Sequence, residues 1–279
     1  MTSDHAAPDH AASVDTARRR FRELHQPGVD CFVLPNPWDV GSARILESLG
    51  FAALATTSSG FAASMGRPDM SVTADELVAH VAAITAAVSV PLNVDAERCY
   101  ADTPEGVAAT VERLAAAGAS GISIEDWDPA SGRIDPLAVA VERVEAAVQV
   151  CARHGIVLTG RAENLLHGVD DLDDTIARLQ AYRDAGAGCV YAPGLARPDD
   201  IARVVAETGT PVNVLLLRGV PAVPELAHLG VRRVSTGGGL AWAAYGALVA
   251  AARELQRTGT NEFTGGALPA EIRAIAFRG

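Results

Sequence analysis

Residues 90–126, VPLNVDAERCYADTPEGVAATVERLAAAGASGISIED, have the pattern of a strand, a helix and a second strand. The apolar runs at 90–97 and 121–126 have strand length, and the alanine-rich segment between them has helix length. Two strands that are joined by a helix usually run parallel in one sheet. This stretch therefore predicts a β–α–β unit and places the chain in the α/β class.

The same alternation of apolar runs and helical patterns extends over the whole chain. Eight runs have the length of a strand, namely 31–39, 51–59, 90–97, 121–126, 156–163, 189–195, 211–217 and 232–239. Eight β–α units in 279 residues predict one (β/α)8 TIM barrel with extra C-terminal helices. In such a barrel the functional site lies at the C-terminal ends of the strands.

The barrel is expected to be the only domain. Residues 1–15 are expected to form a flexible N-terminal arm, and residues 16–279 a single barrel domain. Within that domain, residues 240–279 are expected to form a C-terminal helical segment. Because the first helix of this segment is strongly apolar, we expect it to pack on a neighbouring subunit of a homo-oligomer, a dimer or a tetramer.

Composition limits the classes of partner. The chain has 49% hydrophobic residues and a formal net charge of −11, which favours a small-molecule ligand over nucleic acid. No apolar run reaches the roughly 18 residues that a membrane span needs, and the polar start lacks a signal-peptide core. We therefore expect a cytoplasmic protein without a membrane partner.

Lysine is absent from the sequence, because all 23 basic residues are arginines. This excludes Schiff-base aldolase chemistry, a covalently held pyridoxal cofactor and a Walker-type phosphate site. The four cysteines show no CxxC pair and are expected to be reduced and mostly structural. An enolate in this protein would therefore need a metal, arginines or backbone amides for its stabilisation.

Charged side chains stand at the ends of three predicted strands. Asn93, Asp95 and Glu97 alternate onto one face of the strand at 90–97. Glu125 and Arg161 end the next two strands. Carboxylates are the ligands that hard divalent cations prefer, so the pattern predicts an enzyme that uses a divalent metal.

Five segments, taken together, match one known superfamily. They are PNPWDVGSARILESLGFAALATTSSGFAASMGRPD (35–69), VDAERCY (94–100), GISIED (121–126), GRAENLLHG (160–168) and VNVLLL (212–217). Over nearly its whole length, the chain resembles the isocitrate lyase and phosphoenolpyruvate mutase superfamily. The resemblance implies an enzyme that uses Mg²⁺, or Mn²⁺, and acts on the C–C or P–C bond beside the carbonyl of a 2-oxo or 2-hydroxy carboxylate. It also implies a homotetramer in which neighbouring barrels exchange the C-terminal helix.

The resemblance assigns metal-binding roles to four acids. It implies that Asp95 is the main metal carboxylate, that Glu97 and Glu125 are the second and third acids, and that Asp69 holds metal-bound water. Mg²⁺ suits such a set, because it binds few carboxylates and keeps several waters that substrate oxygens can displace. The alternative for Glu125 and Asp69 is a structural role, as a helix cap or as the partner of an arginine.

The resemblance also implies which residues bind the substrate. Ser59 and Gly60 would hold its carboxylate and oxo group, and Arg161 would clamp the second carboxylate or a phosphonate. Trp38 would form a wall of the pocket, and Asn213 would add a polar contact.

For catalysis, the candidate residues are Arg161, Glu125 and Tyr100, with His167 as a second candidate proton carrier. Arg161 has an alternative role, which is to neutralise Glu125 or Glu163. Cys99 stands where most members of the superfamily have glycine, and we expect it to fill space beside the metal.

One segment departs from the superfamily pattern. Its lyases carry a lysine and a cysteine in the loop after the fourth strand, and its mutases and phosphonopyruvate hydrolases carry a lysine there. Here the loop is WDPASGRID (127–135), with neither residue. What remains can bind a 2-oxo acid on Mg²⁺ and stabilise an enolate.

The sequence therefore predicts a Mg²⁺-dependent carbon–carbon lyase. It would act on a small 2-oxo or 2-hydroxy di- or tricarboxylate, by retro-aldol cleavage or decarboxylation, and leave an enolpyruvate held by the metal. Four alternatives stay open: a P–C bond enzyme, a transferase like ketopantoate hydroxymethyltransferase, a phosphate-binding barrel that uses STGGG (235–239), and a non-catalytic protein that binds oxo acids.

Overall fold

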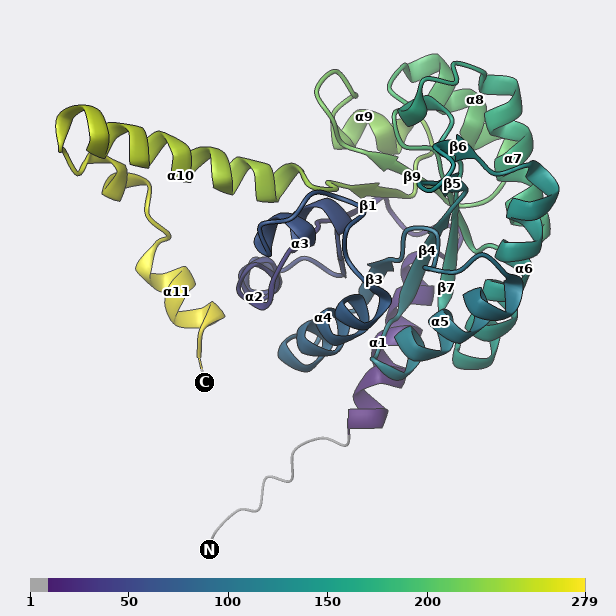
Figure 1. The fold of residues 1–279 in the computed structure, drawn as a ribbon, viewed down its shortest axis with the longest axis horizontal. Coiled ribbons are helices and arrows are strands. Elements are labelled where there is room, and N and C mark those ends of the chain that lie inside the picture. The colour runs from purple at the N-terminus through teal and green to yellow at the C-terminus, as the bar shows by residue number, and fades with distance from the viewer. Residues whose placement is uncertain (1–9, 279) are drawn as a thin grey trace, which may run out of the picture.

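A computed structural model describes residues 10–278 and shows a nearly closed barrel of parallel strands (Figure 1). Within these residues the sheet order is β1-β10-β9-β8-β7-β4-β3-β2, and each pair of neighbours is parallel. The strands are β1 Phe32–Leu34, β2 Leu54–Ala55, β3 Leu92–Asp95, β4 Gly121–Glu125, β7 Val157–Arg161, β8 Cys189–Tyr191, β9 Val212–Leu215 and β10 Arg233–Ser235. The predicted TIM barrel is confirmed, and each strand lies inside its predicted run.

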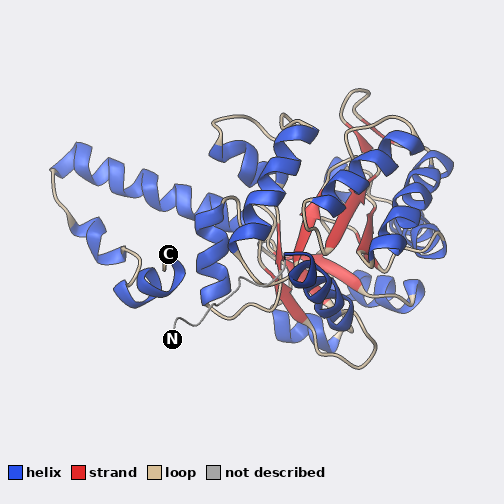
Figure 2. Ribbon diagram, turned by 90° about the horizontal axis from the view of Figure 1, so that it is seen from below, coloured by secondary structure: helices blue, strands red, loops and turns tan. Residues whose placement is uncertain are grey.

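Helices surround the strands and follow them in alternation (Figure 2). They are α2 Val40–Ser48, α4 Ala74–Ala87, α5 Pro104–Ala116, α6 Leu137–His154, α7 Leu172–Asp184, α8 Pro198–Thr208 and α9 Val223–His228. Local signals set their ends: Thr73 and Glu76 form a capping box before α4, and Gly155 ends α6 in the left-handed conformation. Apolar side chains from both layers fill the space between the helices and the sheet.

Asn36 joins the two ends of the sheet, between β1 and β2. Its Nδ2 donates to Thr56 O (2.7 Å), and its Oδ1 accepts from the amides of Thr236 (2.8 Å) and Gly237 (2.9 Å). The amide of Ala55 also donates to Pro35 O (3.0 Å) across the same junction. These bonds hold the ends of β1, β2 and β10 together where the ladder of strand pairs is interrupted.

The segment expected to be an N-terminal arm, 1–15, is partly helical. Helix α1 spans His10–Leu24, and residues 1–9 lie outside the described residues. Alanine and arginine favour helix here, and the helix is anchored by Phe21, which is fully buried, and by Arg18, which donates to Ala119 O (3.0 Å). Helix α1 therefore begins inside the segment that was expected to be an arm.

Two short elements add to the C-terminal end of the barrel. Helix α3, Ser58–Ser64, begins directly after β2, and a hairpin of β5 Trp127–Asp128 and β6 Arg133–Ile134 follows β4. The hairpin occupies the segment 127–135 that departs from the superfamily pattern. A 3-10 turn, η1 Leu165–His167, follows β7, and the ring of His167 stacks on Trp127 with 3.4 Å between centroids.

The C-terminal segment leaves the barrel as a long helix, α10 Gly239–Thr258, and returns through η2 Glu262–Gly266 and α11 Ala270–Ala276 (Figure 1). Large apolar side chains of α10 are exposed, namely Trp242, Leu248, Val249 and Leu255. Helix α11 contacts α2 of the same chain. None of the helices within residues 10–278 has the length and apolar character to cross a membrane.

Candidate active site

A cavity of about 160 Å³ opens at the C-terminal ends of the strands. Asp95, Arg161, Asn213 and Ser235 line it together with Asp69. Drug-sized ligands usually occupy about 300–1,000 Å³, so this volume suits a smaller polar molecule. A cavity of about 380 Å³ lies at the opposite end, around His25, but its lining residues include no carboxylate.

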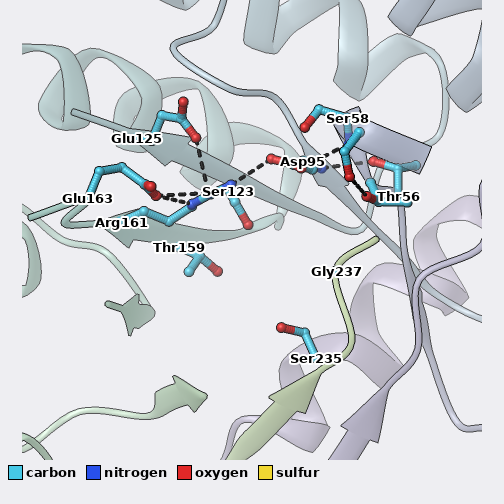
Figure 3. Close-up of polar contacts among 12 residues, drawn as sticks. Thr56, Ser58, Asp95, Ser123, Glu125, Thr159, Arg161, Glu163, Ser235 and Gly237 are labelled. Atoms are coloured by element: carbon cyan, nitrogen blue, oxygen red, sulfur yellow. Dashed lines mark hydrogen bonds and ion pairs between the residues drawn. The ribbon is translucent and has the colours of Figure 1, made fainter. Parts of the chain in front are cut away.

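Arg161 lines this cavity and lies among three acidic side chains (Figure 3). Asp95 also lines the cavity, whereas Glu125 and Glu163 are outside its lining. Its Nη1 lies 2.7 Å from Asp95 Oδ1, and its Nη2 lies 3.1 Å from Glu125 Oε2 and 2.8 Å from Glu163 Oε1. The register explains part of this arrangement, because Glu125 of β4 is paired with Arg161 of β7. The structure thus supports the alternative role, in which Arg161 neutralises neighbouring acids.

Burial and charge shift the pKa values of this group in opposite directions. Burial raises the pKa of Glu125 and of Glu163, and the guanidinium of Arg161 opposes both shifts. Burial alone would lower the pKa of Arg161, but Glu163, Glu125 and Asp95 outweigh it and hold that pKa well above its usual value. One guanidinium therefore faces three acidic groups, so in this cluster the acids outnumber the basic side chain.

Asp95 is held in place by the end of β2. Its amide donates to Thr56 Oγ1 (2.9 Å), and its Oδ2 accepts from the amide of Ser58 (3.1 Å). Thr56 directly follows β2 and Ser58 begins α3, so the strand-to-helix turn positions the carboxylate. Asp95 combines this fixed position with partial exposure to the cavity.

The turn after Asp95 is strained. Glu97, Cys99 and Tyr100 have φ values of 48°, 58° and 52°, in the region that favours glycine. Arg143 of α6 holds this turn, since its Nη1 donates to Ala101 O (2.7 Å) and its Nη2 to Arg98 O. Cys99 is fully buried in the apolar core, in accord with its expected role as a filler of space.

The acids beside this turn fit a hard cation. Glu97 is 5% exposed, and its Oε1 has no hydrogen-bond partner in the described part of the chain. Burial, followed by the charges of Asp95 and Asp69, raises the pKa of Glu97 to about 8. An unpartnered carboxylate oxygen among like charges is costly, and a bound cation would relieve that cost.

No three His, Cys, Asp or Glu side chains within residues 10–278 converge as a ready-made ligand set. This limits the kind of metal that the site suits. Zn²⁺ normally takes three or four protein ligands, whereas Mg²⁺ commonly takes one or two carboxylates and keeps waters. The donor set therefore fits Mg²⁺ or a similar ion, with Asp95 and Asp69 as the carboxylates that line the cavity.

Other predicted residues occupy different positions from those expected. Trp38 lies outside this cavity and lines an apolar one beside α2 and α10, because the chain turns away after Asn36. Gly60 is inside α3, where its amide donates to Thr57 Oγ1 (3.4 Å). Tyr100 is outside the cavity lining and hydrogen-bonds Glu97. The structure does not bring these three to the cavity, whereas Ser59 and Asn213 line it.

Three backbone amides of the glycine-rich segment STGGG already have partners within the protein. The amides of Thr236 and Gly237 donate to Asn36 Oδ1, and that of Gly239 donates to Thr236 O (3.0 Å). These amides are therefore not available to cradle a phosphate.

Sequence reasoning did not name Tyr191 or Arg233, which line the cavity, and it gave Ser235, which forms a pair with Arg233 on β10, only as part of STGGG. Tyr191 ends β8, and the pair alternates along β10. Strand alternation could have indicated Arg233 and Ser235, because their segment RRVS carries polar residues two apart. Tyr191 gave no such signal, since a tyrosine in an apolar run usually packs in the core.

Comparisons with known proteins show which family and which folds the chain resembles. The profile of the family described as phosphoenolpyruvate phosphomutase matches residues 21–256. An oxaloacetate decarboxylase of Bradyrhizobium sp. is 30% identical over 93% of this chain and 89% of its own length.

Two solved structures extend the likeness over almost the entire barrel. A lyase/mutase candidate from Burkholderia cenocepacia J2315 is 47% identical, with a TM-score of 0.89 over 94% of this chain and 96% of its own. Oxaloacetate acetylhydrolase in complex with the product oxalate is 25% identical, with a TM-score of 0.85 over 94% of each chain.

Proposed function

The chain belongs to the phosphoenolpyruvate phosphomutase family, and on that premise we propose that it is a divalent-metal-dependent carbon–carbon lyase acting on a small 2-oxo dicarboxylate. The observation that carries the proposal is the meeting of Asp95, Arg161 and Asp69 in one small polar cavity at the C-terminal ends of the strands. The similar oxaloacetate decarboxylase makes oxaloacetate the first substrate to test and decarboxylation the first reaction.

Asp95, with Glu97, Glu125 and Asp69 acting through water, is proposed to hold the cation. A divalent cation at this position supplies a Lewis acid that polarises the 2-oxo group. Mg²⁺ is the proposed ion, because the donor set is all carboxylate and few of its oxygens are accessible. The unpartnered Oε1 of Glu97 supports this assignment.

The substrate would meet polar groups on every side of the cavity. Ser59 and Asn213 offer hydrogen bonds from opposite walls, α3 and β9. Arg161 can bind a substrate carboxylate only by exchanging one of its present partners, because its three nitrogens all contact carboxylates. We propose that Arg161 leaves Asp95 for the substrate, which frees an oxygen of Asp95 at the same time.

The hairpin β5–β6 is proposed to take the place of a moving loop. Its exit is fixed, since Asp135 pairs with Arg98 (3.1 Å) and its amide donates to Asp126 O (2.7 Å). Trp127 is fixed by its stack on His167. A short hairpin that is held in place suits decarboxylation. This reaction needs no residue from a mobile loop once the enolate is stabilised.

The proposal is tested by NMR observation of oxaloacetate consumption with Mg²⁺, with and without EDTA. Mg²⁺ alone accelerates this decarboxylation, so a protein-free sample and Asp95→Ala serve as controls. Pyruvate formed faster than in both controls supports decarboxylation, and oxalate with acetate would indicate hydrolytic C–C cleavage instead. Turnover that persists in EDTA or in Asp95→Ala contradicts the proposal.

The same NMR assay distinguishes the alternatives. Consumption of phosphonopyruvate would indicate a P–C bond enzyme, and a reaction that requires a folate donor would indicate a hydroxymethyltransferase. Oxalate binding without turnover of any substrate would indicate a non-catalytic binding protein. We keep the lyase first, because the similar oxaloacetate decarboxylase spans most of this chain.

We also propose that the protein works in the cytoplasm as a homotetramer in which α10 packs on a neighbouring subunit. The exposed side chains of Trp242, Leu248 and Leu255 support this proposal. Isolated subunits rarely expose several large apolar groups along one helix.

A further inference from the structure

A carbon–carbon lyase needs a group that delivers a proton to the enolate carbon, and the loop that supplies such groups elsewhere in the superfamily has no lysine or cysteine here. Tyr100 does not meet the need, because it lies outside the cavity lining and hydrogen-bonds Glu97. His167 is also outside the lining and stacks on Trp127. Among the described residues that line the cavity there is no histidine or cysteine.

We propose that Tyr191 is the catalytic acid that protonates the enolate carbon, an inference that rests on the proposed lyase function. Tyr191 lines the cavity with Asp95 and Arg161, and it is the one phenol among the described residues there. It stands on β8 between Arg161 of β7 and Asn213 of β9, to which it is paired in register. Paired residues of neighbouring strands share a face, so all three side chains belong to the inner face of the barrel.

A chain of hydrogen bonds orients the phenol. Arg233 Nε donates to Asn213 Oδ1 (2.9 Å), and Asn213 Nδ2 donates to Ser235 Oγ (2.9 Å). Ser235 in turn hydrogen-bonds the side chain of Tyr191. Because Ser235 Oγ already accepts a hydrogen bond, its own proton is available to donate to the phenol oxygen. The proton of Tyr191 is then free for the substrate.

A positively charged side chain lies at each end of this chain of hydrogen bonds. No carboxylate of the described residues pairs with Arg233, so its charge polarises the chain toward Ser235. On the other side, the guanidinium carbon of Arg161 lies 5.2 Å from the centroid of the Tyr191 ring. Burial, with the charges of Glu163 and Asp95, raises the pKa of the phenol, whereas Arg161 and the hydrogen bond of Ser235 lower it. The net shift is upward, so the phenol is protonated at rest and Arg161 and Ser235 are the groups that would stabilise its anion.

The proposed step balances as follows for oxaloacetate. The C3–C4 bond breaks, CO₂ leaves, and the electron pair remains as an enolate across C2 and C3. The O–H bond of Tyr191 breaks, a C3–H bond forms, and pyruvate results. The phenolate then takes a proton from water, so each turnover consumes one proton from the solvent.

The test compares Tyr191→Phe with the matched control Tyr245→Phe on α10. The first readout is the reverse of the protonation step, the exchange of pyruvate methyl protons in D₂O with Mg²⁺, followed by NMR. The others are oxaloacetate turnover, oxalate binding by calorimetry and thermal unfolding. We expect Tyr191→Phe to lose at least about 100-fold in exchange and turnover. Oxalate affinity and Tm should stay close to those of the unmodified protein, and the control should match it in every readout.

Exchange in Tyr191→Phe within threefold of the unmodified protein overturns the assignment of Tyr191 and leaves the lyase proposal intact. An unmodified protein that neither turns over oxaloacetate nor exchanges pyruvate protons overturns both. If Tyr191→Phe does not fold, Ser235→Ala provides the second variant. Loss of its hydrogen bond to the phenolate is expected to slow exchange about tenfold, and unchanged exchange in that variant also overturns the inference.

Discussion

At the residue scale, the two oxygens of Asp95 already have partners, Arg161 (2.7 Å) and the amide of Ser58 (3.1 Å). A cation therefore binds at a remaining lone pair of these oxygens or displaces one of the two partners. Strand alternation predicted that Asp95 and Arg161 face inward, but it could not predict their pairing. That pairing depends on the register of β3, β4 and β7 and on the length of the arginine side chain. The sequence thus indicated that Arg161 could pair with Glu125 or Glu163, whereas it gave no sign of the pair between Arg161 and Asp95.

Asp95→Asn tests the metal site directly. The amide cannot supply the anionic oxygen that Mg²⁺ prefers, so we expect the variant to lose stabilisation by Mg²⁺. At about 100 times its Kd, Mg²⁺ should stabilise the unmodified protein by about 2.7 kcal/mol, measured as a rise in Tm. Asp102→Asn is the matched control, because Asp102 is exposed and outside the cavity. An equal rise in Tm for Asp95→Asn would place the metal elsewhere.

His25 predicts how stability depends on pH. Its Nδ1 hydrogen-bonds Phe21 O (2.7 Å), and its Nε2 faces Arg233 Nη1 (3.3 Å). Burial, followed by the charge of Arg233, lowers its pKa to about 3. The unfolded state, with an ordinary pKa near 6.5, therefore binds a proton that the folded state does not, and stability falls as pH drops from 6.5 toward 3.

Acid sensitivity should accordingly decrease in His25→Gln. Between pH 7 and pH 4, the neutral His25 lowers the free energy of unfolding of the unmodified protein by about 3 kcal/mol. The variant should not show this decrease, although its free energy of unfolding at pH 7 is lower. Urea unfolding at both pH values measures the difference. His228→Gln, at an exposed histidine of α9, should keep the full acid sensitivity. The same slope in all three proteins would contradict a neutral His25.

At the element scale, the strands and the covering helices were predictable because each has a clear period and a local end signal. Helix α3 and the hairpin β5–β6 were not, since seven residues, SSGFAAS, and two-residue strands are too short to show a period. The boundary of α1 was also missed, because its order depends on the burial of Phe21 against the barrel. Elements that depend on tertiary contacts are therefore difficult to predict from a single sequence.

Asn36 offers a test of the junction between β1 and β2. Asn36→Leu keeps the approximate volume but removes the hydrogen bonds to Thr56, Thr236 and Gly237. It leaves the buried carbonyl of Thr56 and two part-buried amides without these partners. We expect the free energy of unfolding to fall by about 2–4 kcal/mol, measured with urea. Asn261→Leu, at an exposed position, should change it by less than about 0.5 kcal/mol. A loss below about 1 kcal/mol for Asn36→Leu would show that the strand ends are held by other contacts.

At the scale of the whole molecule, α10 is the helix whose large apolar side chains the barrel does not bury. Leu248 is 64% exposed and Trp242 55% exposed, on a helix that projects away from the core (Figure 1). Burial of such side chains stabilises a contact by about 1.5–3 kcal/mol each, whereas a charge placed in the contact opposes it. The unmodified chain of 28.9 kDa should therefore form an oligomer. The Leu248→Glu variant should form smaller species, as measured by its mass in light scattering. Val139→Glu places the same charge at an exposed apolar position on α6 and should leave the assembly unchanged. A monomeric unmodified protein, or a Leu248→Glu variant of undiminished mass, would mean that α10 is not the subunit contact.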